Sequence, residues 1–370
     1  MLFKALFLPL LFAVALIFVL CLDIVGQTPS PTPAEENEVI RIETELINVP
    51  VTVIDRAGKP ILDLKRSNFT VYEDGKQQEI TDFSTTSAPF EVALLLDTSG
   101  STRGDLELIK RSAQLFIESL RPGDRVSIIA FESSPGKQPS PQIHTRLTDD
   151  RSRLKTALQA VSLGNGTPYY DSLIEIMDKV FSGEPEKEFR GRRALVALTD
   201  GVDSTSLTDF EEAMTRIEGE GLITYFIKVD TRGFFESELL GDCQTAIRFS
   251  MAQIRRYYRL IGAKNTEQAA NFCQLGEFER LAVSKALYDL ADKEMAQLAR
   301  SSGGKVFPVG DLSEARNAFR SVAAEIGTNY GLGYYTSNEA RDGRFRSIRV
   351  EVKGLPDGAQ VRAREGYTAR

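Results

Sequence analysis

The stretch that decides the fold is VALLLDTSGS, residues 92–101. Its first half is a continuous apolar run, which is typical of a strand buried on both faces of a parallel sheet. Its second half places three oxygen-bearing side chains, Asp97, Ser99 and Ser101, at alternate positions of a turn that contains glycine. Ligands of open α/β sheets bind beyond the carboxyl ends of the strands. We therefore expect a binding loop at Asp97, on the upper edge of an α/β domain.

Strands and helices alternate along the chain after this stretch. For example, the apolar residues Ile109, Ala113, Phe116 and Leu120 have helical spacing. The pattern predicts further strands at residues 125–131, 194–198, 222–229 and 305–309. It predicts helices at residues 105–120, 149–161, 168–181, 207–217 and 313–326, and the end of a helix over residues 293–300, which stops at Gly303-Gly304. This alternation indicates an α/β domain over residues 90–328, a doubly wound sheet with helices on both faces.

Short alternating runs typical of β-structure flank this domain. Strands are predicted at residues 46–54, 69–73 and 78–83, with a strong hairpin signal at Asp74-Gly75, and again at residues 330–336, 347–353 and 359–367. In the simplest arrangement the two sets pair with each other. Residues 39–89 and 329–370 would then be two parts of a small all-β sandwich into which the α/β domain is inserted.

Residues 231–285 interrupt the α/β alternation with amphipathic helical stretches. We interpret them as a helical insertion, with packing as the favoured role and partner recognition as the alternative. The insertion contains Cys243 and Cys273, which would be free to pair in an oxidising compartment. Sequence alone leaves that pairing open, because it does not give the geometry that a disulfide needs. The basic pair Arg255-Arg256 is expected on a solvated helix face.

The N-terminus predicts export. Lys4 precedes an apolar run at residues 5–22, which is the pattern of a secretory signal peptide and is also long enough for a membrane anchor. Residues 1–26 are therefore assigned to one of these two, and residues 27–38, rich in Pro, Thr and Glu, to a linker. The expected location is extracytoplasmic: secreted, periplasmic or anchored to a membrane by this segment alone.

Composition excludes several classes of function. The net charge of −7 without a basic block argues against nucleic-acid binding. A single histidine, His144, expected on the surface of an edge strand, disfavours both His-rich metal sites and Ser-His-Asp catalysis. The sequence also lacks a Gly-rich phosphate loop with lysine and a general base with an evident partner. We therefore expect a protein that is not an enzyme.

Two further loops carry hard oxygen donors to the predicted edge. Thr167 lies in GNGTP, residues 164–168, before a helix, and Asp200 ends the strand of residues 194–198. Taken alone, Thr167 could simply cap a helix and Asp200 could belong to an ordinary turn. Together with Asp97 they predict a site for Mg²⁺, Mn²⁺ or Ca²⁺, cations that prefer oxygen ligands. A dication would also remove the repulsion between two neighbouring carboxylates.

These residues resemble the metal-ion-dependent adhesion site of the von Willebrand factor A (VWFA) family. Residues 97–101 are similar to the first loop of that site, and Thr167 and Asp200 match its second and third ligand positions. The resemblance covers residues 90–327. The closing RAREGY, residues 362–367, and the flanking β segments are similar to exported bacterial VWFA-related proteins.

The resemblance implies a Rossmann-like fold and an exported adhesion or assembly module. Its cation, Mg²⁺ first with Mn²⁺ or Ca²⁺ as alternatives, would bind an acidic residue of a protein partner. The implied metal-binding residues are Asp97, Ser99, Ser101, Thr167 and Asp200. The serines and the threonine would act through hydroxyls, Asp97 largely through water, and Asp200 by carboxylate or water. A structural envelope protein with a fold-stabilising cation and a metal-dependent hydrolase are the alternatives. Some family members shift their last helix on binding, here residues 313–326.

Overall fold

The computed structural model describes residues 46–132, 139–243, 248–263 and 272–369. These residues belong to one compact unit, residues 44–370. The predicted signal peptide or anchor and the predicted linker lie outside the described residues. Within the described ranges, no helix combines the length and the apolar character needed to cross a membrane.

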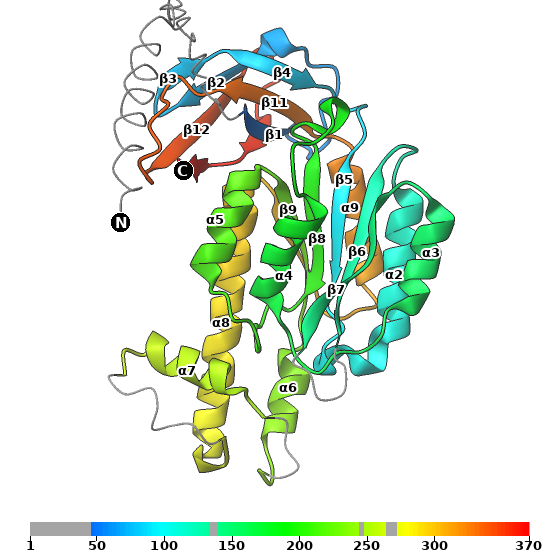
Figure 1. The fold of residues 1–370 in the computed structure, drawn as a ribbon, viewed down its shortest axis with the longest axis vertical. Coiled ribbons are helices and arrows are strands. Elements are labelled where there is room, and N and C mark those ends of the chain that lie inside the picture. Colours follow the sequence, from blue (N-terminus) through cyan, green and yellow to red (C-terminus); the bar gives the residue numbers. More distant parts are fainter. Residues whose placement is uncertain (1–45, 133–138, 244–247, 264–271, 370) are drawn as a thin grey trace, which may run out of the picture. The chain divides into compact units, whose positions relative to one another are not determined.

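A six-stranded sheet forms the centre of the α/β domain (Figure 1). Its order is β10 (Lys305–Val309), β9 (Ile223–Val229), β8 (Arg193–Thr199), β5 (Glu91–Leu96), β6 (Arg125–Glu132) and β7 (Ser140–Thr148). Neighbouring strands are parallel except for β6 and β7, which are antiparallel. Strand β5 lies inside the sheet, and each of its residues is buried. This agrees with the continuous apolar run from which the fold was predicted.

Helices cover both faces of this sheet. One core contains residues of α2 (Leu106–Ser119), α3 (Arg151–Ala160) and α9 (Ala315–Ile326). The other contains residues of α4 (Tyr169–Glu175), α5 (Phe210–Glu220) and α8 (Glu277–Ser302). Alternate residues of β5 serve the two cores: Leu94 packs in the first, and Leu95 packs in the second. The predicted doubly wound sheet is confirmed.

Strands from both ends of the described chain form two antiparallel sheets. One has the order β13 (Gln360–Ala363), β1 (Leu46–Ile54), β11 (Tyr330–Tyr335) and β4 (Ile80–Ser84). The other has the order β14 (Gly366–Thr368), β12 (Phe345–Val352), β2 (Phe69–Glu73) and β3 (Lys76–Gln78). Apolar residues of both sheets share one core. The hairpin between β2 and β3 turns at Asp74 and Gly75, whose φ angles of 46° and 80° are those a tight hairpin turn requires.

A buried arginine joins this sandwich to the α/β domain. Both connections between the two parts pass Arg192, whose side chain is fully buried. Its guanidinium donates to Thr85 O (3.0 Å) and Pro89 O (3.0 Å) in the segment that enters the domain, and to Asn329 O (2.6 Å) in the segment that leaves it. It also lies over the ring of Phe90, 4.1 Å from the centroid. Arg192 therefore holds both connections with one side chain.

Several element boundaries differ from the predictions. The predicted strand of residues 78–83 is β4, and β3 precedes it as a separate strand. The predicted strand of residues 359–367 divides into β13 and β14, which pair in different sheets. The predicted helix of residues 168–181 is α4 followed by a π-helical turn, Ile176–Val180. Shorter 3-10 turns lie at Arg66–Asn68, Gly100–Asp105, Lys187–Phe189 and Phe272–Gln274.

The helical insertion is continuous with the domain. Its helices are α6 (Arg232–Leu239), α7 (Met251–Leu260) and the first half of α8. Helix α8 has 26 residues, so the helix whose end was predicted over residues 293–300 begins within the predicted insertion. The helix is buried along its length because it packs in two different apolar cores. Leu287 packs in the core of the insertion, and Leu298 packs in the core against the central sheet. It ends at Gly303, as the sequence indicated.

A disulfide closes the insertion. Cys243 and Cys273 are bonded, and their Cα atoms are 5.2 Å apart. The pairing that the sequence left open is therefore made. The bond lies beside a separate apolar core that includes Leu239, Phe249 and Phe272.

Candidate metal site

The Asp97 loop begins where β5 ends. The Asp97 N–H donates to Leu198 O (2.9 Å), which ties the loop to the end of β8. The Asp97 carboxylate accepts from the Ser99 N–H (3.0 Å) at one oxygen and from the Thr199 hydroxyl (2.7 Å) at the other. The Asp97 side chain is thus fixed from its own loop and from the neighbouring strand. It is also buried, at 1% exposure.

Ser99 follows in a tight turn. The Thr102 hydroxyl donates to Ser99 O (3.0 Å) and to Asp97 O (3.2 Å), which closes the loop on itself. Ser99 is itself buried. Ser101 lies in the 3-10 turn that comes next, and its side chain is outside what the structure describes. Its predicted role as a ligand therefore stays a prediction.

Thr167 is held by the loops on either side of it. Gly164 N–H donates to Thr98 O (2.8 Å), and a Cβ at Gly164 would lie only 2.6 Å from Phe131 O. Glycine is needed here because the loop packs directly on the backbone at the end of β6. The Thr167 N–H donates to the Ser204 hydroxyl (2.8 Å), and Ser204 N–H donates to Thr167 O (3.0 Å). This reciprocal pair fixes Thr167 to the loop that follows β8.

Asp200 directly follows β8 and is also buried. One of its carboxylate oxygens accepts from the Val202 N–H (2.9 Å), and the other accepts from the Thr231 hydroxyl. The hydroxyls of Thr231 and Tyr288 are 2.9 Å apart. Asp200 is therefore connected through Thr231, at the end of β9, to helix α8 of the insertion.

These loops converge on one pocket. Ser99, Thr167 and Asp200 all line a pocket of about 550 Å³ at the carboxyl ends of the strands. Asp97 is within electrostatic reach, since its charge raises the pKa of Asp200. The structure thus brings together four of the residues predicted to hold a metal, and leaves the Ser101 side chain undescribed.

The two carboxylates give the pocket its electrostatic character. Burial raises the pKa of Asp97, although hydrogen bonds from Ser99 and Thr199 lower it. Burial and then the charge of Asp97 raise the pKa of Asp200 to about 7. Two buried acids that resist ionisation side by side would be stabilised as anions by a cation between them.

The donor set fits a hard dication. Asp97 and Asp200 supply carboxylates, and Ser99 and Thr167 supply hydroxyls, which are the oxygen ligands that Mg²⁺, Mn²⁺ and Ca²⁺ take. Among the described residues, no cluster of three or more His, Cys, Asp or Glu side chains could hold a metal. A site here would therefore depend on hydroxyl groups as much as on carboxylates.

The insertion forms the opposite wall of this pocket. Its lining residues come from α6, from the segment before α7, from α7 and from α8: Phe235, Arg248, Phe249, Ser250, Gln253 and Tyr288. The insertion has the predicted packing role, because it contains its own apolar core. It also borders the candidate site, where it supplies lining residues that the sequence did not indicate.

Helix α7 contacts the site through Arg256. The Arg256 guanidinium lies 3.7 Å from the Asp203 carboxylate, donates to the Tyr170 hydroxyl (3.2 Å) and stacks on the Tyr170 ring at 4.8 Å. Asp203 in turn accepts from the Tyr169 N–H (3.0 Å), at the start of α4. Burial raises the pKa of Asp203, while the Ser206 hydroxyl and the charge of Arg256 lower it. The prediction that Arg256 lies on a solvated face was wrong.

His144 also differs from its prediction. It lies in edge strand β7 as expected, but its side chain is only 11% exposed. Its Nε2 atom lies 2.9 Å from the carboxylate of Glu132, at the end of β6.

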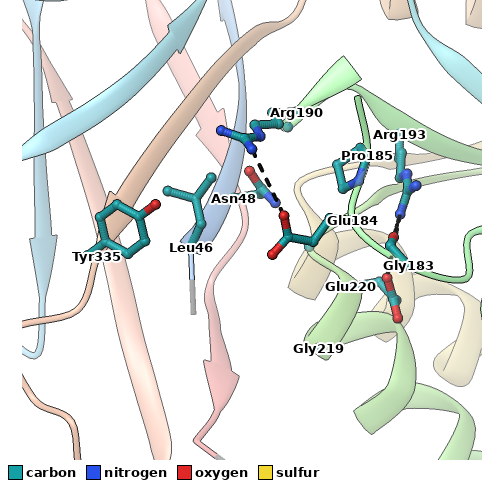
Figure 2. Close-up of a pocket in the computed structure, with 12 residues that line it drawn as sticks. Leu46, Asn48, Gly183, Glu184, Pro185, Arg190, Arg193, Gly219, Glu220 and Tyr335 are labelled. Carbon is teal, nitrogen blue, oxygen red and sulfur yellow. Dashed lines mark hydrogen bonds and ion pairs between the residues drawn. The ribbon is translucent and has the colours of Figure 1, made fainter. Parts of the chain in front are cut away.

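A second pocket, of about 400 Å³, lies near the starts of the parallel strands (Figure 2). Figure 2 shows Arg190 directed at Glu184, with the two charges 4.0 Å apart, and Arg193 beside Glu220, at 3.8 Å. Arg193 also pairs with buried Glu91, at 2.9 Å. Opposite charges pair with each other in this pocket, whereas the first pocket brings the Asp200 carboxylate together with two predicted hydroxyl ligands, Ser99 and Thr167. The first pocket is therefore the better candidate.

Sequence reasoning missed the residues that orient the predicted ligands. Thr199 and Thr231 hold the two carboxylates, and Ser204 holds Thr167. Thr199 directly precedes Asp200, and Thr231 follows β9 at the same sheet edge. A search of every strand end for hydroxyl side chains would have found both threonines.

Residues 92–202 match a family model described as the von Willebrand factor type A domain. The matched range begins in β5 and ends just after Asp200, so it contains all the predicted ligands. No curated protein matches the chain.

Several solved structures are similar to the chain. A von Willebrand factor type A protein from Catenulispora acidiphila is 12% identical, with a TM-score of 0.42, over 89% of this chain and 64% of that one. Proximal thread matrix protein 1 from the mussel byssus is 13% identical, with a TM-score of 0.39, over 64% of this chain and 48% of that one. An aerotolerance-related membrane protein from Bacteroides fragilis is 17% identical, with a TM-score of 0.37, over 64% of this chain and 98% of that one. The chain spans less than two thirds of the length of the first two proteins.

Proposed function

Because the chain carries a von Willebrand factor type A domain, a family generally made of adhesion or protein-interaction modules, we propose that it is a cation-dependent binding protein. A divalent cation, Mg²⁺ first, is held by Asp97, Ser99, Ser101, Thr167 and Asp200. Through that cation the protein binds an acidic group of a protein partner. The observation that carries the proposal is the convergence of Ser99, Thr167 and Asp200 on one pocket beside buried Asp97.

The chain's own residues have distinct tasks in this proposal. Ser99 and Thr167 line the pocket and would supply their hydroxyls as neutral ligands. Thr199 and Thr231 fix the carboxylates of Asp97 and Asp200, so that neither has to be ordered when the cation arrives. A bound dication supplies positive charge that few direct carboxylates neutralise, which leaves it able to accept a carboxylate from another molecule.

Binding rather than catalysis is proposed because the pocket offers few catalytic groups. Its lining, among the described residues, includes no histidine, cysteine or lysine.

An extracytoplasmic location is proposed as well. The bond between Cys243 and Cys273 supports it, because disulfides persist in oxidising compartments.

Thermal melting tests the cation. We expect Mg²⁺ or Mn²⁺ to raise the Tm of the wild type above its value in EDTA, since a ligand at 100 times its Kd adds about 2.7 kcal/mol of stability. Asp97→Ala and the nearly isosteric Thr167→Val should reduce the shift. Asp149→Ala, which removes an exposed carboxylate, is the matched control and should keep it. An equal Tm in EDTA and in each cation would refute cation binding.

A capped peptide, Gly-Gly-Asp-Gly, tests the acidic ligand. We expect it to bind in Mg²⁺, to lose binding in EDTA, and to lose binding when asparagine replaces its aspartate. NMR titration measures the weak affinity expected of so small a ligand. A cation that stabilises the protein without any peptide binding would favour the alternative of a purely structural cation.

A further inference from the structure

The wall that the insertion contributes to the candidate metal pocket is aromatic. Phe235, Phe249 and Tyr288 all line the pocket. The Phe235 ring centroid lies 5.6 Å from that of Phe249 and 6.2 Å from that of Tyr288. Phe249 is supported from behind by Phe272, at 5.9 Å. This wall faces the oxygen-rich loops across a space in the size range, about 300–1,000 Å³, that buries a ligand group.

The same wall carries a positive charge. Arg248 lines the pocket, and its Nε donates to Cys243 O (3.0 Å), which ties it to the disulfide. The next residues begin α7 with a reciprocal cap: Gln253 N–H donates to the Ser250 hydroxyl (3.1 Å), and Ser250 N–H donates to Gln253 Oε1 (3.0 Å). The segment that carries Arg248 and Phe249 is therefore anchored at both ends.

Large apolar side chains close in sequence to the lining residues are exposed. Phe234 is 53% exposed and precedes Phe235, Met251 is 42% exposed and follows Ser250, and Leu207 is 98% exposed two residues after Thr205. A ligand that only filled the pocket would leave these side chains in water. A segment of a larger protein could cover them as well, which is how interfaces gain their apolar contacts.

We propose that the insertion selects the partner. The ligand is an extended protein segment in which the acidic residue lies next to an aromatic or large apolar side chain. The carboxylate is directed at the cation site and Arg248, and the apolar side chain packs on Phe235, Phe249 and Tyr288. This inference rests on the proposed function, because it names the kind of segment that the same site accepts.

Three capped peptides test the selection: Gly-Phe-Asp-Gly, Gly-Gly-Asp-Gly and Gly-Phe-Asn-Gly. In Mg²⁺ we expect the first to bind about tenfold more tightly than the second, from burial of its phenyl ring, and the third to bind least. Phe235→Leu should reduce the preference for the first peptide over the second. Arg248→Gln should weaken both acidic peptides, and Arg255→Gln, on the exposed side of α7, is the matched control.

The outcomes separate the two proposals. Equal binding of the first two peptides, with no effect of Phe235→Leu or Arg248→Gln, would overturn the inference and leave the proposed function standing. If Mg²⁺ does not raise the Tm of the wild type above its value in EDTA, the proposed function itself is refuted. Free 3-phenylpropionate serves as a fourth ligand in the same titrations. If it binds as tightly as Gly-Phe-Asp-Gly, the ligand is a small aromatic acid, and the assignment to a protein segment is wrong.

Discussion

Asp200 shares its buried surroundings with Asp97: burial first, and then the charge of Asp97, raise the pKa of Asp200 to about 7. An acid with a raised pKa keeps its proton longer in the folded protein than in the unfolded chain. Between the unfolded pKa of about 4 and the folded pKa of about 7, unfolding therefore releases a proton. We expect Asp200 to make the cation-free protein lose stability as the pH rises through this window. The measurement is Tm against pH in EDTA.

Asp200→Asn is the control for this pH dependence. The variant has no carboxyl to titrate at this position, so its Tm should fall less steeply than that of the wild type between about pH 4 and pH 7. Saturating Mg²⁺ should also flatten the curve of the wild type, because it favours the ionised carboxylates. Parallel curves for wild type and variant would show that Asp200 does not titrate in this range.

Gly164→Ala should displace the loop that carries Thr167. Its Cβ would lie 2.6 Å from Phe131 O, and backbone cannot move aside as a flexible side chain can. We expect a loss of about 1–3 kcal/mol in the free energy of unfolding, together with a smaller Mg²⁺-induced shift in Tm. Gly219→Ala is the matched control, because a Cβ there meets nothing within 4 Å. An unchanged Mg²⁺ shift in Gly164→Ala would mean that the position of this loop does not matter for the cation.

Arg256→Ala should loosen the start of α4. Arg256 contacts Asp203, and Asp203 accepts from the Tyr169 N–H directly after Thr167-Pro168. We expect faster hydrogen exchange at Tyr169, a stability loss of about 1 kcal/mol because the ion pair is partly exposed, and weaker Mg²⁺ binding. Arg255→Ala should change none of these. Faster exchange without any change in Mg²⁺ affinity would limit Arg256 to a structural role.

Removing the disulfide with Cys243→Ser and Cys273→Ser should destabilise the insertion locally. The bond closes a loop with a sequence separation of 30, for which the loss of chain entropy in the unfolded state corresponds to about 3.6 kcal/mol. Because the insertion has an apolar core of its own, we expect hydrogen exchange to rise in α7 and stay low in β5. An equal rise in both elements would show that the insertion and the central sheet unfold together.

The sequence predicted the fold best where the apolar pattern of a segment directly reflects its burial in the structure. The apolar run of β5 could only suit a strand covered on both faces, and its neighbours in the sheet bury each of its residues. Because parallel strands end at one edge, the residue pattern was enough to predict that the loops at Asp97 and Asp200 meet. Thr167 lies in the loop before α4 and joins them through Ser204.

The remaining features depend on contacts between distant segments. Arg256 was predicted on a solvated face because nothing in the sequence of its helix indicates that Asp203 and Tyr170 contact its side chain. The aromatic wall of the pocket could likewise not be predicted from the sequence, since Phe235 and Phe249 would suit a buried core equally well. Helix periodicity indicates which face of a helix is buried, but it does not indicate what that face is buried against.

Arg192 has a mechanical consequence. With one guanidinium it holds the connection from β4 to β5 and the connection from α9 to β11, the two crossings between the sandwich and the α/β domain. Arg121 adds a bond to Gly327 O (2.6 Å), just beyond α9. A shift of α9 along its axis would have to stretch these bonds or carry β11 with it.

Tension on the chain would therefore take a defined route. In the proposed function, a pull on a partner bound at the Asp97 loop would enter β5 along its length and reach the sandwich at Arg192. A pull on the chain before Leu46 enters β1, which is paired on one side with β11 and on the other with β13. Both ladders would be loaded in shear, so many hydrogen bonds resist together rather than opening one after another. Under the proposed function, the fold would therefore transmit force from a partner bound at the Asp97 loop to β1, the strand with which the described residues begin.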